Sequence, residues 1–386
     1  MDPTAVDPAP PPDRLAERLD RVGSALERRV GPWAAAGCAA GVLLVAAAIY
    51  VTPQLRPIIQ GAHYQSLSNA PFSDPASPVR GRFVSPLLAW LLRLNGPRFV
   101  AFPPLMALLF LGAVIVSARR RGYLPAEAWG AAALVAFSSP VLSMLQLPGF
   151  VDITTCLLLF LAFANVRSPA AWSPLLLLAI LNHESALFIV PGFLVLAWPA
   201  GSGRRPVAAF AAAVLSALVP ALLYRLWLER SGGFHYSHRF YLQTQGIRTG
   251  LMTVIPHLWL GVFMAFKLFW ILPILGARLA LARGDRRRAA ALAVVVAGAL
   301  TQICLAGDVT RLVGLAFPAV LLGADEVRRA WGPESWRSKL WLFIGFHLLV
   351  PQYFIYFGFA NPQFPLPLSL LAIALGVPAS VVFGAG

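Results

Sequence analysis

Long apolar segments, each followed by a short polar interruption, repeat along this chain of 386 residues from position 33 almost to its end. A helix rises about 1.5 Å per residue, so about 20 apolar residues cross the hydrocarbon core of a bilayer. The pattern predicts an all-α polytopic membrane protein with about twelve transmembrane or re-entrant helices. The expected segments are 33–52, 99–118, 126–147, 150–166, 169–182, 185–200, 206–227, 252–277, 289–306, 311–323, 340–357 and 366–384. Of these, 169–182 and 311–323 are short for a crossing, so we expect broken or re-entrant helices there.

The composition supports this class of protein. Hydrophobic residues make up 58% of the chain and charged residues 12%, whereas soluble proteins carry roughly 25% charged residues. These values argue against a soluble globular enzyme and against a disordered chain. Residues 1–30 are rich in proline and charge, with a short amphipathic helix expected after the prolines. We therefore divide the chain into an N-terminal cytoplasmic segment, 1–30, and a single transmembrane helical domain, 31–386.

The net charge of +15 has to be divided between the two sides of the membrane. Basic clusters occur at 119–121, 204–205, 278–288 and 328–339, and basic residues in short loops favour the cytoplasmic side. Placing all of them inside leaves both termini cytoplasmic and gives outer loops at 53–98 and 228–251. A surplus of arginine remains outside, which points to an anionic ligand. The arginines form no nucleic-acid recognition motif, so we expect no nucleic-acid partner.

With this orientation, most polar residues that interrupt apolar sequence fall on the outer side. They are the two outer loops, Asp152, the break at 182–184, and Asp308 with Arg311. Polar groups at membrane depth are costly and usually line a cavity or a protein interior. We therefore expect an outward-facing cavity and look for the functional site there.

The first outer loop carries several candidates for chemistry. His63 can act as a base or phosphate ligand, because a free histidine titrates near neutrality. Asp74 is the only carboxylate of the loop. Arg80 and Arg82 can hold a phosphate through bidentate hydrogen bonds. The alternative is a solvated loop whose arginines contact lipid headgroups.

Charged residues next to apolar segments provide further candidates. Asp152 opens an apolar segment, where it can serve as a general base, bind an acceptor or merely cap a helix. His183 and Glu184 interrupt a long uncharged stretch, so both need hydrogen-bond partners, whether for a ligand or for the fold. Asp308 and Arg311 can pair on one helical turn, and a structural ion pair is the favoured interpretation.

Lys267 lies in the middle of a predicted span. There it needs a polar partner or a route by which its amine reaches the membrane surface.

The second outer loop combines aromatic and basic residues. The candidate ligand-binding residues are His235, Tyr236, His238 and Arg239. This composition suits sugar stacking together with phosphate binding, although an interfacial aromatic belt has the same composition. His235 and His238 are three residues apart, but no acidic cluster accompanies them. We therefore expect no metal site and no cofactor.

Together these features resemble bacterial membrane glycosyltransferases of the GT-C superfamily. The resemblance covers most of residues 33–325 and rests on sparse motifs and topology: a large first outer loop beginning with His63-Tyr64, an Arg82-Phe83-Val84-Ser85-Pro86 lead into an interfacial helix at 82–94, Asp152, His183-Glu184-Ser185 and Asp308-Val309-Thr310-Arg311. It implies a polyprenyl-phosphate-linked sugar donor, a glycan, lipid or protein acceptor, inversion at the anomeric carbon and an active site at the outer face of a bacterial cytoplasmic membrane.

One departure from the family concerns the catalytic base. Those enzymes typically carry an Asp or Glu early in the first outer loop, where this chain has His63. Either Asp74 or Asp152 is then the base, or the chemistry has been lost or changed, and metal use is in doubt for the same reason.

Two further hypotheses remain beside the glycosyltransferase. One is a non-catalytic transporter or binding protein for an anionic lipid or glycan, which needs the arginines but no base. The other is a membrane scaffold whose outer polar residues only pack together.

Overall fold

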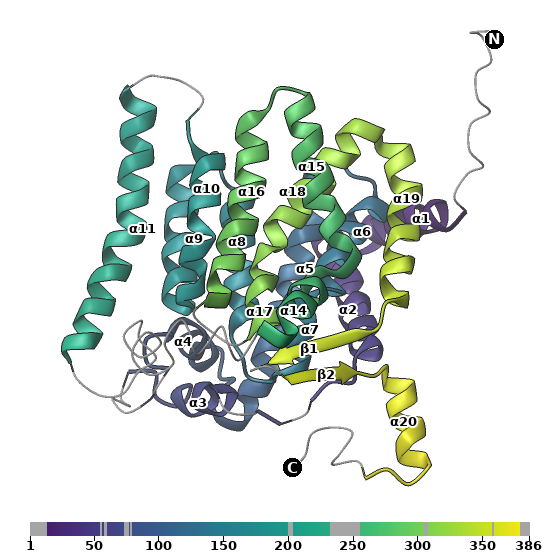
Figure 1. Cartoon of the computed structure of the whole chain (residues 1–386), viewed down its shortest axis with the longest axis horizontal. Helices are drawn as coiled ribbons and strands as arrows, with labels where there is room; N and C mark the ends of the chain where they lie inside the picture. Colours follow the sequence, from purple (N-terminus) through teal and green to yellow (C-terminus); the bar gives the residue numbers. More distant parts are fainter. Residues whose placement is uncertain are drawn as a thin grey trace.

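Helices form along most of the predicted apolar segments in the computed structural model (Figure 1). The structure describes residues 14–54, 56–57, 60–72, 77, 79–199, 204–231, 255–304, 308–356 and 359–378. The expectation of an all-α architecture is confirmed for these residues apart from one two-stranded antiparallel sheet.

The described elements fall into two parts of the chain, before and after residues 232–254. The first part contains α1 (Arg14–Val30), α2 (Pro32–Tyr50), α3 (Gln60–Leu67), α4 (Val84–Leu91), η1 (Gly96–Ala101), α5 (Phe102–Arg120), α6 (Pro125–Ala136), α7 (Ser139–Gln146), α8 (Asp152–Ala164), α9 (Pro169–Asn182), η2 (Glu184–Phe188), α10 (Val190–Ala197) and α11 (Arg204–Arg230). The second part contains η4 (Ile255–His257), α14 (Leu258–Phe266), η5 (Lys267–Trp270), α15 (Ile271–Ala282), α16 (Arg286–Thr301), η6 (Gln302–Cys304), α17 (Val309–Val313), η7 (Gly314–Ala316), α18 (Phe317–Trp331), α19 (Pro333–Leu349), β1 (Gln352–Tyr356), β2 (Phe359–Gln363) and α20 (Leu366–Ala374).

Several of these helices are long and apolar enough to cross a membrane. Within the described residues there are five: Pro32–Tyr50, Gly96–Arg120, Arg205–Arg230, Ile255–Ala282 and Arg286–Cys304. A sixth is obtained if α6 and α7, which are bent by 50° at their junction, count as one span. The apolar helices α8 and α9 are shorter. The structure thus supports a membrane-embedded helical protein, with fewer full-length spans than the twelve expected segments.

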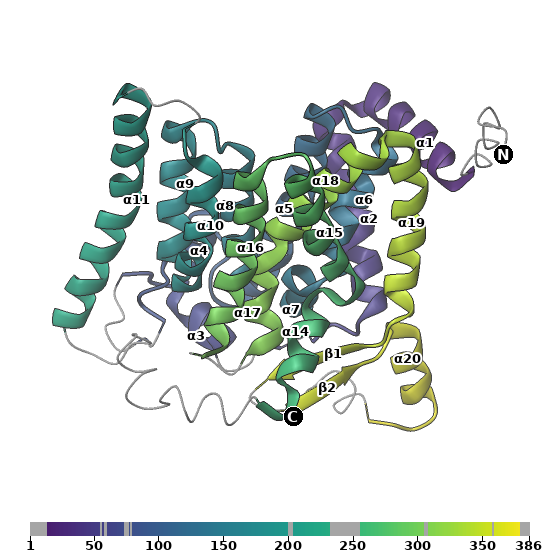
Figure 2. The same ribbon diagram turned by 45° about the horizontal axis from the view of Figure 1, so that its top comes forward.

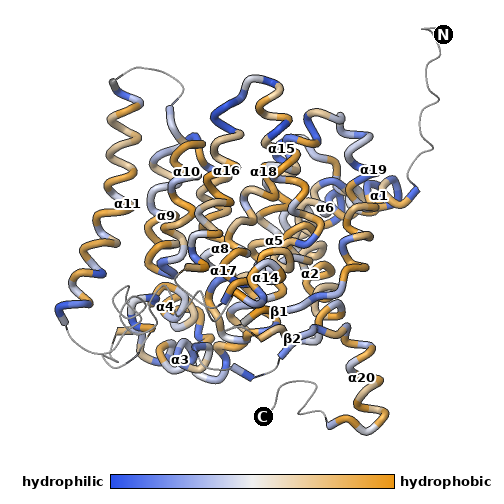
Figure 3. The backbone as a smooth tube through the Cα atoms, in the orientation of Figure 1, coloured by the Kyte–Doolittle hydropathy of each residue, from blue (hydrophilic) through white to orange (hydrophobic). Residues whose placement is uncertain are grey.

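The four basic clusters lie at one end of the helical bundle (Figure 1). Arg121 and Arg288 both contact Asp325, Arg328 pairs with Glu127, and Arg287 bonds to the end of α10 just before the cluster at 204–205. We call this the basic end; α3, α4, α17 and the sheet lie at the opposite end (Figure 1). Figure 3 shows hydrophilic residues gathered at the two ends and apolar residues along the helices between them.

The amphipathic α1 lies across the basic end, at an angle to the helices of the bundle (Figures 1 and 2). Glu27 accepts a hydrogen bond of 2.7 Å from Arg119 of α5. Asp20 accepts one of 2.7 Å from Arg337 of α19 and another of 2.8 Å from the Ala126 amide. The predicted N-terminal helix is confirmed, and these bonds hold it against the bundle.

The buried middle of the bundle is formed by aromatic side chains and small residues. Phe110 of α5 contacts Phe160 of α8 and Phe317 of α18 at ring-centroid distances of 5.9 and 5.1 Å. At the crossing of α15 and α18, Gly276 faces Gly323, and a Cβ on Gly276 would lie 2.6 Å from the Gly323 Cα. Small residues let helix backbones approach closely in membrane proteins, so these glycines set the spacing of the two helices.

Lys267 finds its partners where the helix breaks between α14 and η5. Its φ of 43° lies in the left-handed region, which is uncommon for a residue with a side chain. The buried amine donates to the Tyr50 hydroxyl at 2.6 Å and to the Val350 carbonyl at 3.2 Å. It thereby joins α2, the α14–η5 break and the end of α19.

The C-terminal part differs from the predicted helices. Residues 352–356 were expected to continue a span, but they form β1, which pairs with β2 from Gln352↔Gln363 to Tyr356↔Phe359. That part of the prediction is wrong. The Ile355 amide also donates to the Thr310 hydroxyl at 3.0 Å, so the hairpin closes against α17 beside the charged residues described next.

Candidate functional site

Three breaks in the helical backbone bring charged side chains together at the end opposite the basic end. The first is at His183, where α9 stops and the chain is extended at φ −157° before η2. The other two are the starts of α8 at Asp152 and of α17 directly after Asp308. Asp152 is the first residue of α8 and makes an ion pair, rather than only capping the helix.

Asn182 fixes the position of the first break. Its carbonyl oxygen accepts hydrogen bonds from the Ser85 amide at 2.9 Å and the Ser85 hydroxyl at 2.7 Å. Its amide nitrogen donates to the Val151 carbonyl at 3.0 Å and to the Thr155 hydroxyl at 2.9 Å. All bonding groups of this buried amide are used, so α4, α8 and α9 are locked together next to the charged residues.

Glu184 is held by two arginines. Arg82 pairs with both carboxylate oxygens, its Nε–Oε2 distance being 2.9 Å. Arg225 of α11 reaches Oε2 at 3.0 Å. Arg82 also donates to the Tyr64 hydroxyl at 3.1 Å and to the Gln60 side chain at 3.3 Å. Charge-assisted, bidentate contacts of this kind are the strongest hydrogen bonds in proteins.

A second ion-pair group is centred on Arg311. Its guanidinium donates to Asp152 at 2.8 Å and to Asp308 at 2.7 Å, and it lies 4.9 Å from the centroid of the Phe150 ring. The expected Asp308–Arg311 pair is thus confirmed, with Asp152 as a third member. Two carboxylates on one guanidinium leave this group with an excess of negative charge when both are ionised.

His183 connects the two groups. Its Nδ1 accepts a hydrogen bond from the Ser185 amide at 3.2 Å, and its Nε2 lies 3.7 Å from Asp152 Oδ1. Three buried polar atoms of these groups have no hydrogen-bond partner among the described residues: His183 Nε2, Asp308 Oδ1 and Arg311 Nε. Buried polar groups are normally satisfied by protein or ordered water. We call the whole network the charge cluster: Tyr64, Arg82, Asp152, His183, Glu184, Arg225, Asp308 and Arg311.

Burial and charge move the titrations of the cluster in different directions. Burial lowers the pKa of His183 to about 4, with the charge of Arg82 acting in the same sense. Burial raises the pKa of Asp308 to about 6, against the opposing effect of Arg311. Burial disfavours the ionised form of Glu184, but the positive charges of Arg82 and Arg225 hold its pKa well below its usual value. Near neutral pH, His183 is therefore uncharged and Glu184 ionised.

The structure brings together many of the residues selected from the sequence. Tyr64, Arg82, Asp152, His183 and Glu184 meet in the charge cluster, with Asp308 and Arg311. His63 is exposed on α3 and lies outside it. Arg80 stacks over Trp227 of α11 at 5.1 Å from the ring centroid instead. The remaining predicted residues lie outside the described residues: Asp74, His235, Tyr236, His238 and Arg239.

Arg225 is the member of the cluster that sequence reasoning missed. It occurs on α11 within a predicted apolar span, and a charge inside an apolar segment is the signal that marks such residues. Arg225 passes beside Gly81, where an added Cβ would lie 2.7 Å from its guanidinium. A side chain at position 81 would therefore displace Arg225.

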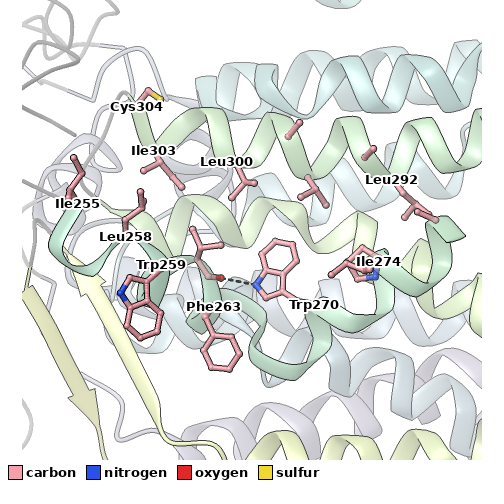
Figure 4. Close-up of a pocket in the computed structure, with 16 residues that line it drawn as sticks. Ile255, Leu258, Trp259, Phe263, Trp270, Ile274, Leu292, Leu300, Ile303 and Cys304 are labelled. Carbon is pink, nitrogen blue, oxygen red and sulfur yellow. Dashed lines mark hydrogen bonds between the residues drawn. The ribbon is translucent and has the colours of Figure 1, made fainter. Parts of the chain in front are cut away.

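An apolar cavity of about 1100 Å³ runs between α14, α15 and α16 (Figure 4). Ile255, Ile303 and Cys304 lie at one end of it, and Ile274 and Leu292 at the other. The end of the cavity at Cys304 is close in sequence to the charge cluster, because Cys304 precedes Asp308 by four residues. In addition, α14 packs on α17 at Gly261, where an added Cβ would lie 2.7 Å from the Val309 side chain.

The chemistry available at this end of the bundle is that of acids, bases and cations. Among the described residues there is no group of three or more His, Cys, Asp or Glu side chains placed to hold a metal ion.

Comparison of the chain with family models, with curated proteins and with solved structures gave no match.

Proposed function

We propose that this chain is a membrane glycosyltransferase that moves a sugar from a polyprenyl-phosphate donor to an acceptor. The observation that carries the proposal is the charge cluster, in which Arg82, Arg225 and Arg311 meet three carboxylates at one end of an apolar bundle. Arginines recognise phosphate well, and a carboxylate can accept the proton of an acceptor hydroxyl.

The apolar cavity between α14, α15 and α16 supports a donor that is linked to a lipid. Its lining is apolar along its length, so it suits a polyprenyl chain better than a free nucleotide sugar. With the tail in this cavity, the phosphate would lie towards the α17 end of the bundle, near Arg311.

In the proposed reaction, a carboxylate takes the proton from the acceptor hydroxyl, with Asp152 or Asp74 as the base. The acceptor oxygen attacks the anomeric carbon as the bond from that carbon to the donor phosphate oxygen breaks. The bonding electron pair leaves with the polyprenyl phosphate. Arg82, Arg311 and Arg239 stabilise the charge that develops there, as positioned cations do, and Arg225 joins them.

We further propose an orientation for the protein. The basic end faces the cytoplasm of a bacterial cell, in accordance with the positive-inside tendency. The charge cluster then faces outward, in a cavity completed by the outer loops. In this orientation α1 lies on the cytoplasmic side, whereas the sheet and α20 lie on the outer side (Figure 1). Helices shorter than a full span, among them α8, α9, α10, α18 and α19, complete a multi-pass arrangement of about twelve crossings or re-entrant segments.

The test is transfer of a labelled sugar from polyprenyl-phosphate donors by the purified full chain. If Asp152 is the base, Asp152→Asn lowers turnover by about a hundredfold or more, because general bases contribute factors of that size, while donor binding persists. Arg80→Gln is the control, since Arg80 contacts α11 outside the cluster. No transfer and no binding across a panel of sugars and acceptors would contradict the proposal.

The second candidate is a non-catalytic binding or transport protein for an anionic lipid or glycan. It is favoured by the pairing of Asp152, Glu184 and Asp308 with arginines, which leaves the described carboxylates of the cluster engaged. Such a protein would keep ligand binding and transport in Asp152→Asn or in Asp74→Asn, whereas the transferase would lose turnover in one of them.

A further inference from the structure

A second apolar groove lies between α10 and α11 at the basic end. Its volume is about 720 Å³, within the range of roughly 300–1,000 Å³ typical of small-ligand sites. Leu194, Val195, Phe210 and Val214 belong to its lining, which is apolar except for one charged side chain, Arg287. The groove lies far along α11 from Arg225 and so is separate from the charge cluster.

Arg287 is placed at the mouth of this groove by the start of α16. Its side chain is exposed, and one guanidinium nitrogen donates to the Trp198 carbonyl at 2.6 Å. A guanidinium has five N–H donors, so this bond fixes Arg287 and leaves donors for an anion. Arg205 and Arg286 are exposed as well, but neither is among the residues that line the groove.

Exposed tryptophans show where the lipid headgroups lie. Trp33, Trp198 and Trp331 are exposed at the basic end. Arg120 lies over the Trp33 ring at 5.3 Å and Lys339 over the Trp331 ring at 4.6 Å. Tryptophan is enriched at the level of the headgroups in membrane proteins. Since Trp198 lines the groove, its mouth lies at that level and its apolar length reaches into the hydrocarbon layer.

We propose that the groove binds one acyl chain of an anionic phospholipid, with the lipid phosphate on Arg287. The apolar lining matches the chain, and the single arginine at headgroup level matches the phosphate. The bound lipid would join α10 to the half of α11 that lies nearest the basic end. This half of α11 is held to α9 by Ser173, whose hydroxyl donates to the Ala213 carbonyl and bonds to the Ser216 hydroxyl. The site does not depend on the proposed transferase activity.

The experiment measures lipid binding to the purified full chain in detergent by native mass spectrometry. The probes are phosphatidylglycerol and phosphatidylcholine with identical acyl chains. We expect tighter binding of phosphatidylglycerol. Arg287→Gln should weaken it about tenfold, the loss of about 1.4 kcal/mol expected for one charge-assisted contact. Arg286→Gln, which removes the neighbouring charge outside the groove, should have little effect.

A second pair of variants tests the apolar part. Ala211 lines the groove and is exposed, whereas Ala212 is exposed outside it. Ala211→Trp should fill the groove and reduce binding of both lipids, while Ala212→Trp should not. Equal effects of the two arginine variants, or unchanged binding in Ala211→Trp, would overturn the proposal. Both outcomes are independent of any transfer assay.

Discussion

Arg82 connects more of the charge cluster than its position in an outer loop predicts. Its guanidinium pairs with Glu184 and donates to Tyr64 and Gln60. Removing one member of a buried ion pair leaves the other charge uncompensated and costs about 3 kcal/mol or more. Arg225 still pairs with Glu184 in Arg82→Gln, so we expect this variant to lower the free energy of unfolding by up to about 3 kcal/mol, measured by denaturant unfolding in detergent micelles.

The control for Arg82 is a double-mutant cycle. Arg82→Gln combined with Glu184→Gln removes both charges of the pair and should recover part of the lost stability. Arg80→Gln, two residues away and partly exposed, should change stability by less than about 1 kcal/mol. If Arg80→Gln and Arg82→Gln were equally harmful, the pair with Glu184 would not be the cause.

The pKa values of His183 and Asp308 shift in opposite directions, so the two residues have opposite effects on stability as the pH falls. The pKa of His183 falls to about 4 in the folded protein, so the unfolded state binds its proton first, and His183 costs stability as the pH falls from about 6.5 to 4. The pKa of Asp308 rises to about 6, so the folded state binds its proton first. Asp308 therefore contributes stability that is lost as the pH rises from about 4 to 6.

Comparison of two variants separates these effects, because they oppose each other in the native protein. The melting temperature of His183→Gln relative to the unmutated chain should increase as the pH falls from 6.5 to 4.5. That of Asp308→Asn should decrease over the same range. Parallel curves of melting temperature against pH for the three proteins would contradict the pKa shifts assigned to both His183 and Asp308.

At this scale, the sequence predicted the cluster through the rarity of charge beside apolar segments. Asp152, His183, Glu184 and Arg311 were selected for that reason, and Arg82 as a possible phosphate ligand of the outer loop. These five residues meet in the structure. Their actual partners could not be predicted, because the pairing of Arg311 with Asp152 joins residues 159 positions apart. Arg225 was missed because its helix resembles a lipid-facing span.

Among the helices, the close crossing of α15 and α18 depends on two glycines. A Cβ on Gly323 would overlap the Leu272 carbonyl, and one on Gly276 would meet the Gly323 backbone. These neighbours are backbone atoms, which cannot rotate away. Gly323→Ala should therefore force the helices apart and lower the free energy of unfolding by about 1–3 kcal/mol.

A glycine in an open position is the matched control. Gly112 lies in α5, and a Cβ added there would meet no atom within 4 Å. Gly112→Ala should leave stability unchanged or raise it by up to about 1 kcal/mol, because alanine is the better helix former. Thermal unfolding of the two variants in the same detergent measures the contrast. A loss in Gly112→Ala equal to that in Gly323→Ala would show that the crossing is not responsible.

The β hairpin shows why element type was harder to predict than apolarity. Residues 352–356 read Gln-Tyr-Phe-Ile-Tyr, and they follow the apolar helix α19 after Val350 and Pro351. A short apolar run is compatible with a buried strand or with a helix, because its periodicity does not separate them. Pairing with 359–363 and the bond from Ile355 to Thr310 decide in favour of the strand, and both are tertiary contacts.

On the scale of the whole molecule, the ends of the bundle are held in different ways. At the basic end, Asp325 and Glu326 of α18 are buried among Arg283, Arg288 and Arg329, and α1 is fastened by Glu27 and Asp20. At the other end, the charge cluster joins α3, α8, α11 and α17. The apolar middle between two charged ends is the arrangement that a bilayer imposes.

This polarity predicts that the two ends lie on opposite sides of the membrane. Ala62 on α3 and Arg286 at the start of α16 are both exposed, at opposite ends. Each can be replaced by a single cysteine in a chain whose native Cys38, Cys156 and Cys304 have been replaced by alanine. In intact bacterial cells, a membrane-impermeant maleimide should label Ala62→Cys and not Arg286→Cys, and permeabilisation should expose the second. The reverse pattern would invert the orientation and place the charge cluster on the cytoplasmic side, where a donor presented at the outer face could not reach it. Labelling of both positions in intact cells would mean that the described helices do not separate the two ends across a bilayer.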